Sequence, residues 1–286
     1  MLGVWREFCH NSTMQHLIPF LVVAFIYLAV AADFWRGVKL NRAKSASSAA
    51  SLKLHSAMIA LGLALHGWLL YQGIFAEGFN LGFYNAVSSI FWLTVLVYWL
   101  ANLKHQLHSL QAFVLPPAAL FALAPAFEVS NHYVPNASQP LFIAHISVAF
   151  LAYGLFTFAA LHALLMLFAE RQLHNKTSLI KLPSFPPLMV MENLLFKVIT
   201  TGFVLLTITL ISGMFFSEQL YGKPLEFTHK IVFSIASWVI YGWLLFGRYQ
   251  YGWRGRKAIN LTLIGFVLLL LAYVVSKFIL QVLLGR

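Results

Sequence analysis

Eight apolar stretches, each long enough to cross a lipid bilayer, constrain the fold of this 286-residue chain more than any other feature. A membrane-spanning helix needs about 20 apolar residues. Inside lipid, only helices and closed barrels satisfy their own backbone hydrogen bonds. The stretches cover roughly residues 17–35, 54–72, 84–101, 109–126, 141–169, 194–216, 230–247 and 258–280. The sequence therefore predicts an all-α fold, a polytopic membrane helix bundle with about eight transmembrane helices.

The basic residues are unevenly divided between the two sets of connecting segments. Fourteen of the 19 Lys and Arg lie on one side: Arg36, Lys39, Arg42, Lys44, Lys53, Lys104, Arg171, Lys176, Lys181, Lys197, Arg248, Arg254, Arg256 and Lys257. The positive-inside rule assigns this side to the cytoplasm, so we expect both termini to face outward from a bacterial inner (plasma) membrane. Because these residues stand between apolar runs, we interpret them as topology signals and expect no nucleic-acid partner.

Several kinds of chemistry are excluded by the scarcity of reactive side chains. The single cysteine, Cys9, excludes an internal disulfide, an iron–sulfur cluster and covalent haem attachment through C-x-x-C-H. Of the eight acidic residues, only Asp33 lies well inside an apolar stretch, and we expect it to pair with Arg36 three residues later. No acid is expected at the membrane midplane for a proton or ion pathway.

The chain is expected to form one membrane domain. Residues 1–16 read as an N-terminal extension without the features of a signal peptide, and Met14 is an alternative start. Residues 17–286 form the single transmembrane domain. Pro116, Pro117 and Pro125 interrupt the fourth stretch, which we expect to be a kinked span. The sequence shows no internal repeat, which disfavours a transporter built from paired halves.

Three histidines, His66, His145 and His229, lie in or beside apolar stretches and are predicted to share the outward side. An ionisable residue in a membrane span is a functional-site hypothesis by default, and imidazole is a common axial ligand of haem iron. His145 is followed by a stripe of small residues: Ala149, Ala152, Ala159 and Ala163. This stripe suits either a packed helix or a porphyrin edge, and helix packing is the commoner reason for such a pattern.

The other two histidines carry more ordinary explanations. His66, in LALHGWLLY, is a buried residue that needs a polar partner, and His229 has the position of an exposed residue at the start of a helix. A second, inner haem between His55 and His162 is disfavoured because the two helix faces agree poorly. Zinc or copper is less suitable than haem, since the acids nearest His229 lie in a loop. Aromatic residues that can line a haem slot are Trp68, Tyr84, Phe91, Trp92 and Phe150.

Several stretches resemble segments of a known family of membrane proteins. They are FNLGFYNAVSSIFW (79–92), LFIAHISVAFLAYGLF (141–156), ITTGFVLLTITLISGMFFSE (199–218) and GWRGRKA (252–258). In order and spacing they resemble the cytochrome c assembly (CcsA) superfamily over roughly residues 55–280. PPLMVMENLLF (186–196) resembles the short YpjD/HemX-like branch of that superfamily.

This resemblance implies a protein that binds haem b and presents it on the outer side for attachment to apocytochrome c. It places His145 at the position of an axial histidine. Two departures stand out. The tryptophan-rich outward loop of the full synthases is missing from residues 219–238, and Phe246 occupies the position of their second histidine. His229, near the start of the same helix, is the expected substitute, and haem binding or an accessory role is favoured over a complete synthase.

Together these features predict an inner-membrane protein that binds haem b and handles it for cytochrome c assembly, more in the manner of an assembly factor than of an enzyme. His145 and His229 are the expected ligands of the haem iron, with His66 as the competing cofactor-binding residue. The expected partners are haem, membrane lipid, and cytochrome c biogenesis proteins or apocytochrome c. The alternative is a regulatory or scaffold membrane protein that binds no haem and acts through partners on the loop 170–193.

Overall fold

The computed structural model describes residues 2–39, 49–76, 78–105, 107–127, 139–174, 187–221, 229–279 and 281, and it describes side chains except at residues 2–16, 37–39, 49–50, 172–174 and 216–221. The elements are α1 (Leu2–Lys39), α2 (Ala49–Phe75), α3 (Phe83–His105), η2 (His108–Leu110), α4 (Gln111–Ala122), η3 (Ala124–Phe127), α5 (Pro140–His174), α6 (Leu188–Tyr221), α7 (His229–Tyr251), α8 (Gly255–Leu269), η4 (Leu270–Val275) and α9 (Ser276–Phe278). Within these ranges, eight helical segments are long and apolar enough to cross a membrane. The predicted all-α, multi-pass membrane fold is confirmed.

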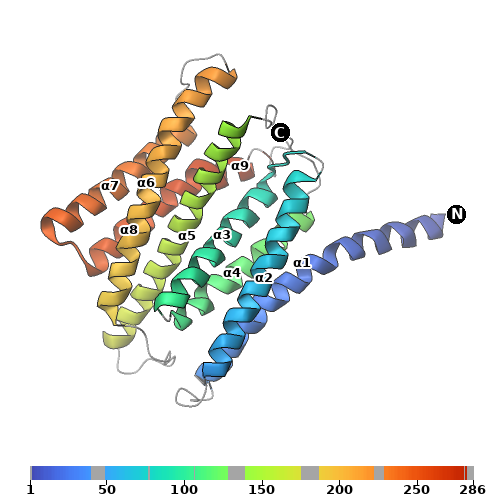
Figure 1. Cartoon of the computed structure of the whole chain (residues 1–286), viewed down its shortest axis with the longest axis horizontal. Coiled ribbons are helices and arrows are strands. Elements are labelled where there is room, and N and C mark those ends of the chain that lie inside the picture. The colour runs from blue at the N-terminus through green and yellow to red at the C-terminus, as the bar shows by residue number, and fades with distance from the viewer. Residues whose placement is uncertain are drawn as a thin grey trace.

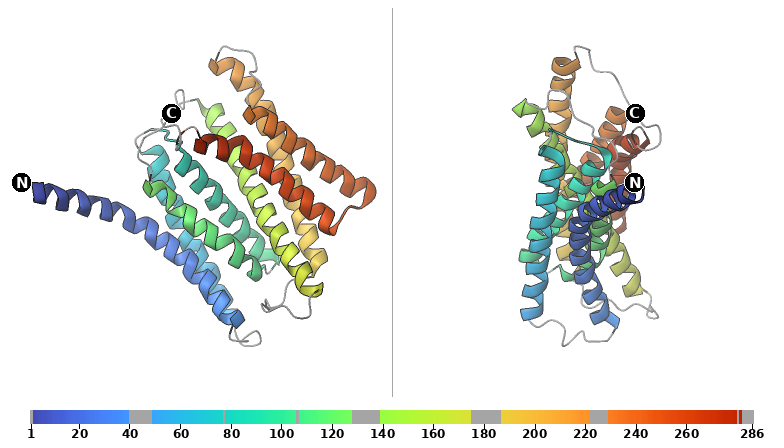
Figure 2. Two further views of the ribbon diagram at one scale, coloured as in Figure 1. Left: turned by 180° about the vertical axis from the view of Figure 1, so that it is seen from behind. Right: turned by 90° about the vertical axis from the view of Figure 1, so that its right-hand side faces the viewer.

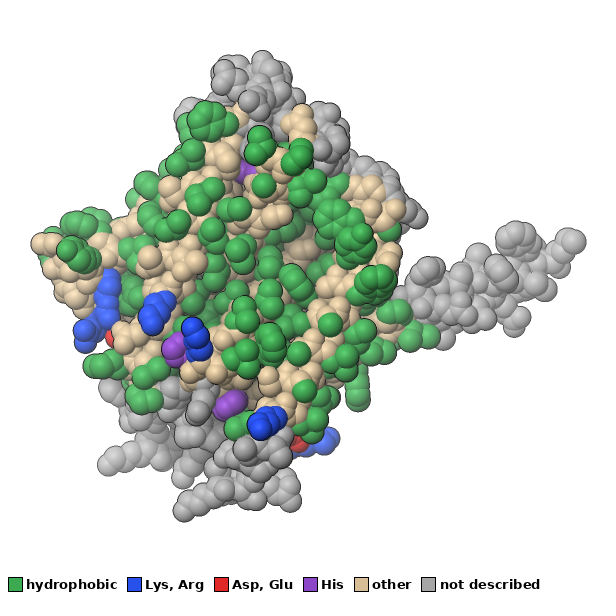
Figure 3. Space-filling view, viewed as in Figure 1, with side chains coloured by type: hydrophobic (Ala, Val, Ile, Leu, Met, Phe, Trp, Pro, Cys, Tyr) green, Lys and Arg blue, Asp and Glu red, His purple; other side chains and the backbone are tan. Residues whose placement is uncertain are grey.

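Consecutive spans run in opposite directions, so alternate helices begin at opposite ends of the bundle (Figures 1 and 2). At the basic end, α1, α3, α5 and α7 finish and α2, α4, α6 and α8 begin; the other end is called the distal end. Described Lys and Arg side chains of the basic end are Arg36, Lys53, Lys104, Arg171, Lys197, Arg248, Arg254, Arg256 and Lys257, against Lys230 and Lys277 at the distal end. Figure 3 shows Lys and Arg gathered toward one end of a broad hydrophobic surface.

The central helix is α5, which packs against α3, α4, α6 and α8. Lipid tails are as apolar as the side chains of a helix, so close van der Waals contact rather than water exclusion holds membrane helices together. At Gly154 on α5, an added Cβ would lie only 2.8 Å from the Cβ of Leu93 on α3. The missing side chain therefore permits the close approach of α3 and α5.

The small-residue stripe of α5 serves helix packing over most of its length. Ala152, Ala159 and Ala163 are buried. Within the same face, the Phe156 ring stacks on Tyr241 of α7 with ring centroids 4.0 Å apart. The commoner of the two interpretations of this stripe is therefore confirmed for residues 152–163.

The fourth and the last membrane spans include turns that are not α-helical. The fourth span continues helically through Pro116 and Pro117, with 3-10 turns, η2 and η3, on both sides of α4. The last span includes a π-helical segment, η4, between α8 and α9. The expected extension over residues 1–16 lies where side chains are outside the described set, and the same holds for most of the loop 170–193.

One expected ion pair is different in the structure. The carboxylate of Asp33 on α1 lies 3.0 Å from Nε2 of His55 on α2, rather than pairing with Arg36 within the described residues. The pair joins neighbouring helices at the basic end and is largely exposed on the Asp33 side. The prediction of a contact within one helix was wrong because the adjacent helix presents an imidazole at the same level.

Candidate functional site

Two of the three candidate histidines lie within the first two turns of helices at the distal end. His145 lies five residues after the start of α5, and His229 is the first residue of α7. His66 lies nine residues before the end of α2, about 13 Å along the helix axis. All three are in the distal half, as expected, but His66 is close to the centre of its span.

The imidazole of His145 is half-buried against α6. Its Nδ1 lies 2.7 Å from the Oγ of Ser212. The hydroxyl of Ser212 has a single proton, which it donates to the carbonyl of Ile208 at 2.7 Å. The Ser212 oxygen therefore accepts a hydrogen bond from the Nδ1–H of His145. We assign this tautomer from the hydrogen bonds around the ring.

This tautomer puts the lone pair of the His145 ring on Nε2. Histidines that ligate metals usually donate their other ring N–H to an oxygen acceptor, which orients the ring and fixes the tautomer. Haem iron takes an imidazole nitrogen as an axial ligand. His145 and Ser212 therefore have the chemistry of a haem ligand and of the residue that orients it.

His229 has a different environment at the start of α7. Its side chain is exposed, and its Nε2 lies 2.9 Å from the Oγ of Ser276, the first residue of α9. Ligation through Nε2 would require this hydrogen bond to break, whereas ligation through Nδ1 would leave it intact. Ser276 would then orient His229 in the way that Ser212 orients His145.

Ring contacts link the surroundings of these two histidines. Phe150 on α5 lies edge to face with Tyr273 of η4, with ring centroids 6.2 Å apart. His145 lies about 7–8 Å along α5 from Phe150, and Ser276 about 4–5 Å beyond Tyr273. His145 and Ser276 are therefore on the distal side of the same ring contact. His229 lies on that side too, because its imidazole contacts Ser276.

Lys277 ties this region to the first half of the bundle. Its ammonium donates to the carbonyl of Leu81 and to the hydroxyl of Tyr273. The Oε1 of Gln281 accepts a hydrogen bond from the backbone N–H of Phe83 at 2.7 Å. Sequence reasoning did not identify Lys277, Tyr273 or Ser276, although a lone lysine near the end of an apolar span is a visible signal.

His66 is a buried residue with polar contacts on both sides of its ring. Only 1% of it is exposed. Its Nε2 lies 2.9 Å from the Oγ of Ser88 on α3, and its Nδ1 lies 3.5 Å from the hydroxyl of Tyr27 on α1. The ring thus connects α1, α2 and α3. If a ring nitrogen of His66 bound iron, that nitrogen would lose its contact with a hydroxyl group. The geometry favours a structural role.

We expect His66→Ala to lower the free energy of unfolding by about 1–3 kcal/mol, because the buried hydroxyls of Tyr27 and Ser88 lose a shared partner. Thermal unfolding in detergent measures the loss. His55→Ala is the matched control, since its ion pair with the exposed Asp33 carboxylate contributes only about 0–1 kcal/mol. An unchanged midpoint for His66→Ala together with loss of a bound cofactor would contradict the structural assignment.

The aromatic residues proposed to line a haem slot do not gather in one place. Trp68 is 60% exposed on α2. Phe91 stacks on Phe121 of the fourth span with centroids 4.5 Å apart. The indole N–H of Trp92 donates to the carbonyl of Leu63 at 2.8 Å. Phe150 belongs to the surroundings of His145 and His229 described above, and Tyr84 lies edge to face with Phe83, whose backbone N–H donates to Gln281.

The structure places His229 and Phe246 toward opposite ends of α7. Phe246 lies near the basic end of α7, where its ring stacks on Trp243. Seventeen residues of helix, about 26 Å, separate it from His229. His229 therefore lies at the distal end, the side on which the substitute was expected, and its role as a ligand stays a prediction supported by its contact with Ser276.

His55 and His162, the two histidines considered for an inner haem, contact other groups in the structure. His55 contacts Asp33, and His162 is fully buried with its Nε2–H donated to the carbonyl of Met191 at 2.9 Å. Throughout the described ranges, no group of three or more His, Cys, Asp or Glu side chains is arranged to hold a metal ion.

Comparison with known proteins places these residues in a family. Residues 51–284 match the family described as Cytochrome C assembly protein. The inner membrane protein YpjD of Escherichia coli is 37% identical over 164 residues, which are 57% of this chain and 61% of YpjD. The alignment thus spans less than two thirds of that relative.

A second relative is similar over a greater length. The cytochrome c biogenesis protein CcsA of Prochlorococcus marinus is 24% identical over 289 aligned residues, which cover 91% of this chain and 89% of that protein. The family match includes His66, His145, His229 and both serines that contact the distal histidines. The resemblance to the YpjD branch is confirmed, and the chain belongs to the cytochrome c assembly protein family.

Proposed function

We propose that this protein binds haem b in a bacterial inner membrane and handles it for the assembly of cytochromes c. The observation that carries the proposal is the 2.7 Å contact between Nδ1 of His145 and Oγ of Ser212, the kind of oxygen partner that orients metal-ligating histidines. Family membership supports the cytochrome c pathway. The names of YpjD and CcsA support the inner membrane and a biogenesis role.

In this proposal His145 and His229 would hold the haem iron through their imidazole nitrogens, with His145 as the leading ligand. When bound, haem would supply an iron centre that takes imidazole nitrogen as a ligand. Ser212 and Ser276 orient the two rings, and Tyr273 helps to place Ser276 relative to α5. The chain contributes binding and orientation and needs no turnover chemistry of its own.

The proposed orientation puts the basic end in the cytoplasm and the distal end outside. The excess of Lys and Arg among the described residues of the basic end supports this by the positive-inside rule. It places His145 and His229 on the side where an apocytochrome c would receive haem. Haem and cytochrome c biogenesis proteins or apocytochrome c are the proposed partners.

An absorption spectrum of the full-length protein, purified in mild detergent from haem-sufficient cells, tests this function. We expect a b-type spectrum from a haem that acidified acetone extracts, because the chain has no C-x-x-C-H for covalent attachment. A folded but colourless protein would contradict haem binding. It would favour the alternative, a regulatory or scaffold protein that acts through protein partners.

A further inference from the structure

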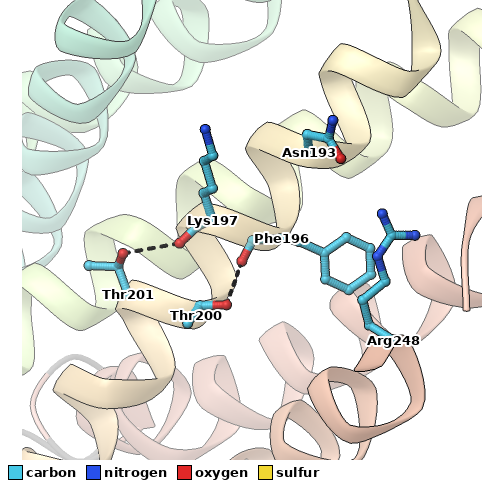
Figure 4. Close-up of a pocket in the computed structure, with 6 residues that line it drawn as sticks. All are labelled: Asn193, Phe196, Lys197, Thr200, Thr201 and Arg248. Carbon is cyan, nitrogen blue, oxygen red and sulfur yellow. Dashed lines mark hydrogen bonds between the residues drawn. The ribbon is translucent and has the colours of Figure 1, made fainter. Parts of the chain in front are cut away.

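An open groove, apolar over most of its lining but with several polar side chains, lies between α6 and α7 toward the basic end (Figure 4). It is open and has a volume of about 660 Å³. The residues that line it are Asn193, Phe196, Lys197, Thr200, Thr201 and Arg248. None of them contacts the candidate haem ligands, which lie at the distal end, so the groove requires a separate explanation.

The groove places polar side chains on a lipid-facing surface. Asn193, Lys197, Thr200 and Thr201 are all exposed and follow the helical spacing of one face of α6. Lys197 lies three residues inside the apolar stretch that begins near residue 194, close to the basic end. A lysine at this level extends its ammonium toward the polar headgroups of the membrane.

The charges in the groove leave an excess of one positive charge. The Arg248 guanidinium lies 4.5 Å from the centre of the Phe196 ring and 4.0 Å from Glu192. Glu192 also accepts a hydrogen bond from the N–H of Gly255 at 2.6 Å. Among the described residues no carboxylate pairs with Lys197. Two cations and one carboxylate are therefore complemented by one singly charged anion.

The polar groups favour a phosphodiester with hydroxyl groups nearby. The guanidinium fork of arginine matches phosphate oxygens in geometry, and lysine adds a point charge. The hydroxyls of Thr200 and Thr201 donate to the carbonyls of Phe196 and Lys197 at 2.8 and 3.0 Å. Their oxygens can therefore accept hydrogen bonds from a ligand hydroxyl.

The same face of α6 becomes apolar toward the distal end. Val204, Ile208 and Ile211 are 52%, 46% and 52% exposed and continue the helical spacing from Thr201. A ligand that matches the whole face has a charged head and a long apolar tail.

We propose that this groove binds the phosphate group of an anionic phospholipid with a hydroxyl-bearing headgroup, from the leaflet at the basic end. Lys197 and Arg248 bind the phosphate, Thr200 and Thr201 accept from the headgroup hydroxyl, and an acyl chain lies along Val204, Ile208 and Ile211. Basic pockets between membrane helices on the cytoplasmic side are suited to such headgroups.

Native mass spectrometry of the delipidated full-length protein with phosphatidylglycerol or phosphatidylcholine tests the proposal. We expect phosphatidylglycerol to bind more tightly, and Lys197→Gln to weaken it about five-fold, since one basic residue near a lipid surface contributes about 1 kcal/mol. The matched control is Lys104→Gln, which removes an exposed lysine from the basic end of α3 and should leave binding unchanged. Equal binding of the two lipids, or equal effects of the two variants, would overturn the site.

A second set of measurements distinguishes the lipid from a soluble anion and guards against misfolding. Inorganic phosphate and glycerol phosphate are added at millimolar concentration as competitors, and we expect neither to displace the lipid. Displacement by either would show that the groove takes a free phosphate group. Thr201→Val keeps the shape of the side chain but removes the acceptor oxygen. It should weaken the binding of phosphatidylglycerol while the protein remains folded. Arg248 is unsuited as the only variant, because its guanidinium also donates to the carbonyl of Trp253.

Discussion

Replacing His145 with alanine is expected to remove most of the haem from the purified protein, with at least a ten-fold lower affinity. Loss of a residue that only orients a metal ligand already costs about 10–100-fold in affinity, and loss of the ligand itself should cost no less. Haem per protein, from the pyridine haemochrome spectrum and a protein assay, measures the effect. A folded His145→Ala protein with the full haem content would contradict the assignment.

Two further variants separate ligation by His145 from a general role in packing. Ser212→Ala removes the acceptor of the Nδ1–H bond and should weaken haem binding about 10–100-fold while the protein remains folded. Its haem should also shift in reduction potential, which a purely structural role would not require. His55→Ala, at the other end of the bundle, should retain its haem and its spectrum.

The second large effect is expected at His229. His229→Gly should convert a six-coordinate, low-spin haem into a high-spin form, because one axial imidazole is lost while His145 remains. Added imidazole should restore the low-spin spectrum by entering the space that the side chain leaves. Optical spectra of the reduced and oxidised protein, before and after imidazole, follow both changes.

His66 supplies the competing outcome for this experiment. His66→Ala should leave the spin state unchanged and act on stability, because its two ring nitrogens contact Ser88 and Tyr27. If His66→Ala gave the high-spin form that imidazole rescues, and His229→Gly left the spectrum unchanged, the pairing of His145 with His229 would be wrong. His229 would then be an ordinary residue at a helix start, held by Ser276.

The membrane fold was predictable because lipid permits few alternatives. A buried backbone without water must form helices, so apolar length alone identifies the spans. The side of each helix end then follows by alternation, and this placed His145 and His229 together at the distal end. The sequence did not predict which helices are neighbours in the bundle, since apolar side chains on different helices are interchangeable partners in lipid.

Ser212, which completes the candidate site, could not be recognised from the sequence because hydroxyl groups in membrane helices commonly bond to the backbone of their own helix. Several hydroxyl groups of this chain donate to the carbonyl four residues earlier, as hydroxyls in membrane helices commonly do. Examples are Ser147, Thr157, Thr207 and Thr209. Ser212 does the same and also accepts from His145, 67 residues away. Nothing in its local sequence distinguishes that second contact.

The π-helical segment η4 has a consequence for how the last span tolerates change in length. An α-helix turns about 100° for each residue, and a π turn accommodates one residue more between hydrogen-bonded groups. Deleting one residue from LLAYVV (270–275) would remove the π turn and leave an uninterrupted α-helix, so the residues that follow would keep nearly the same rotational position. Ser276 and Lys277 would then still face His229 and Leu81. The same deletion elsewhere in the last span, where the helix is regular, would rotate these two residues by about 100°.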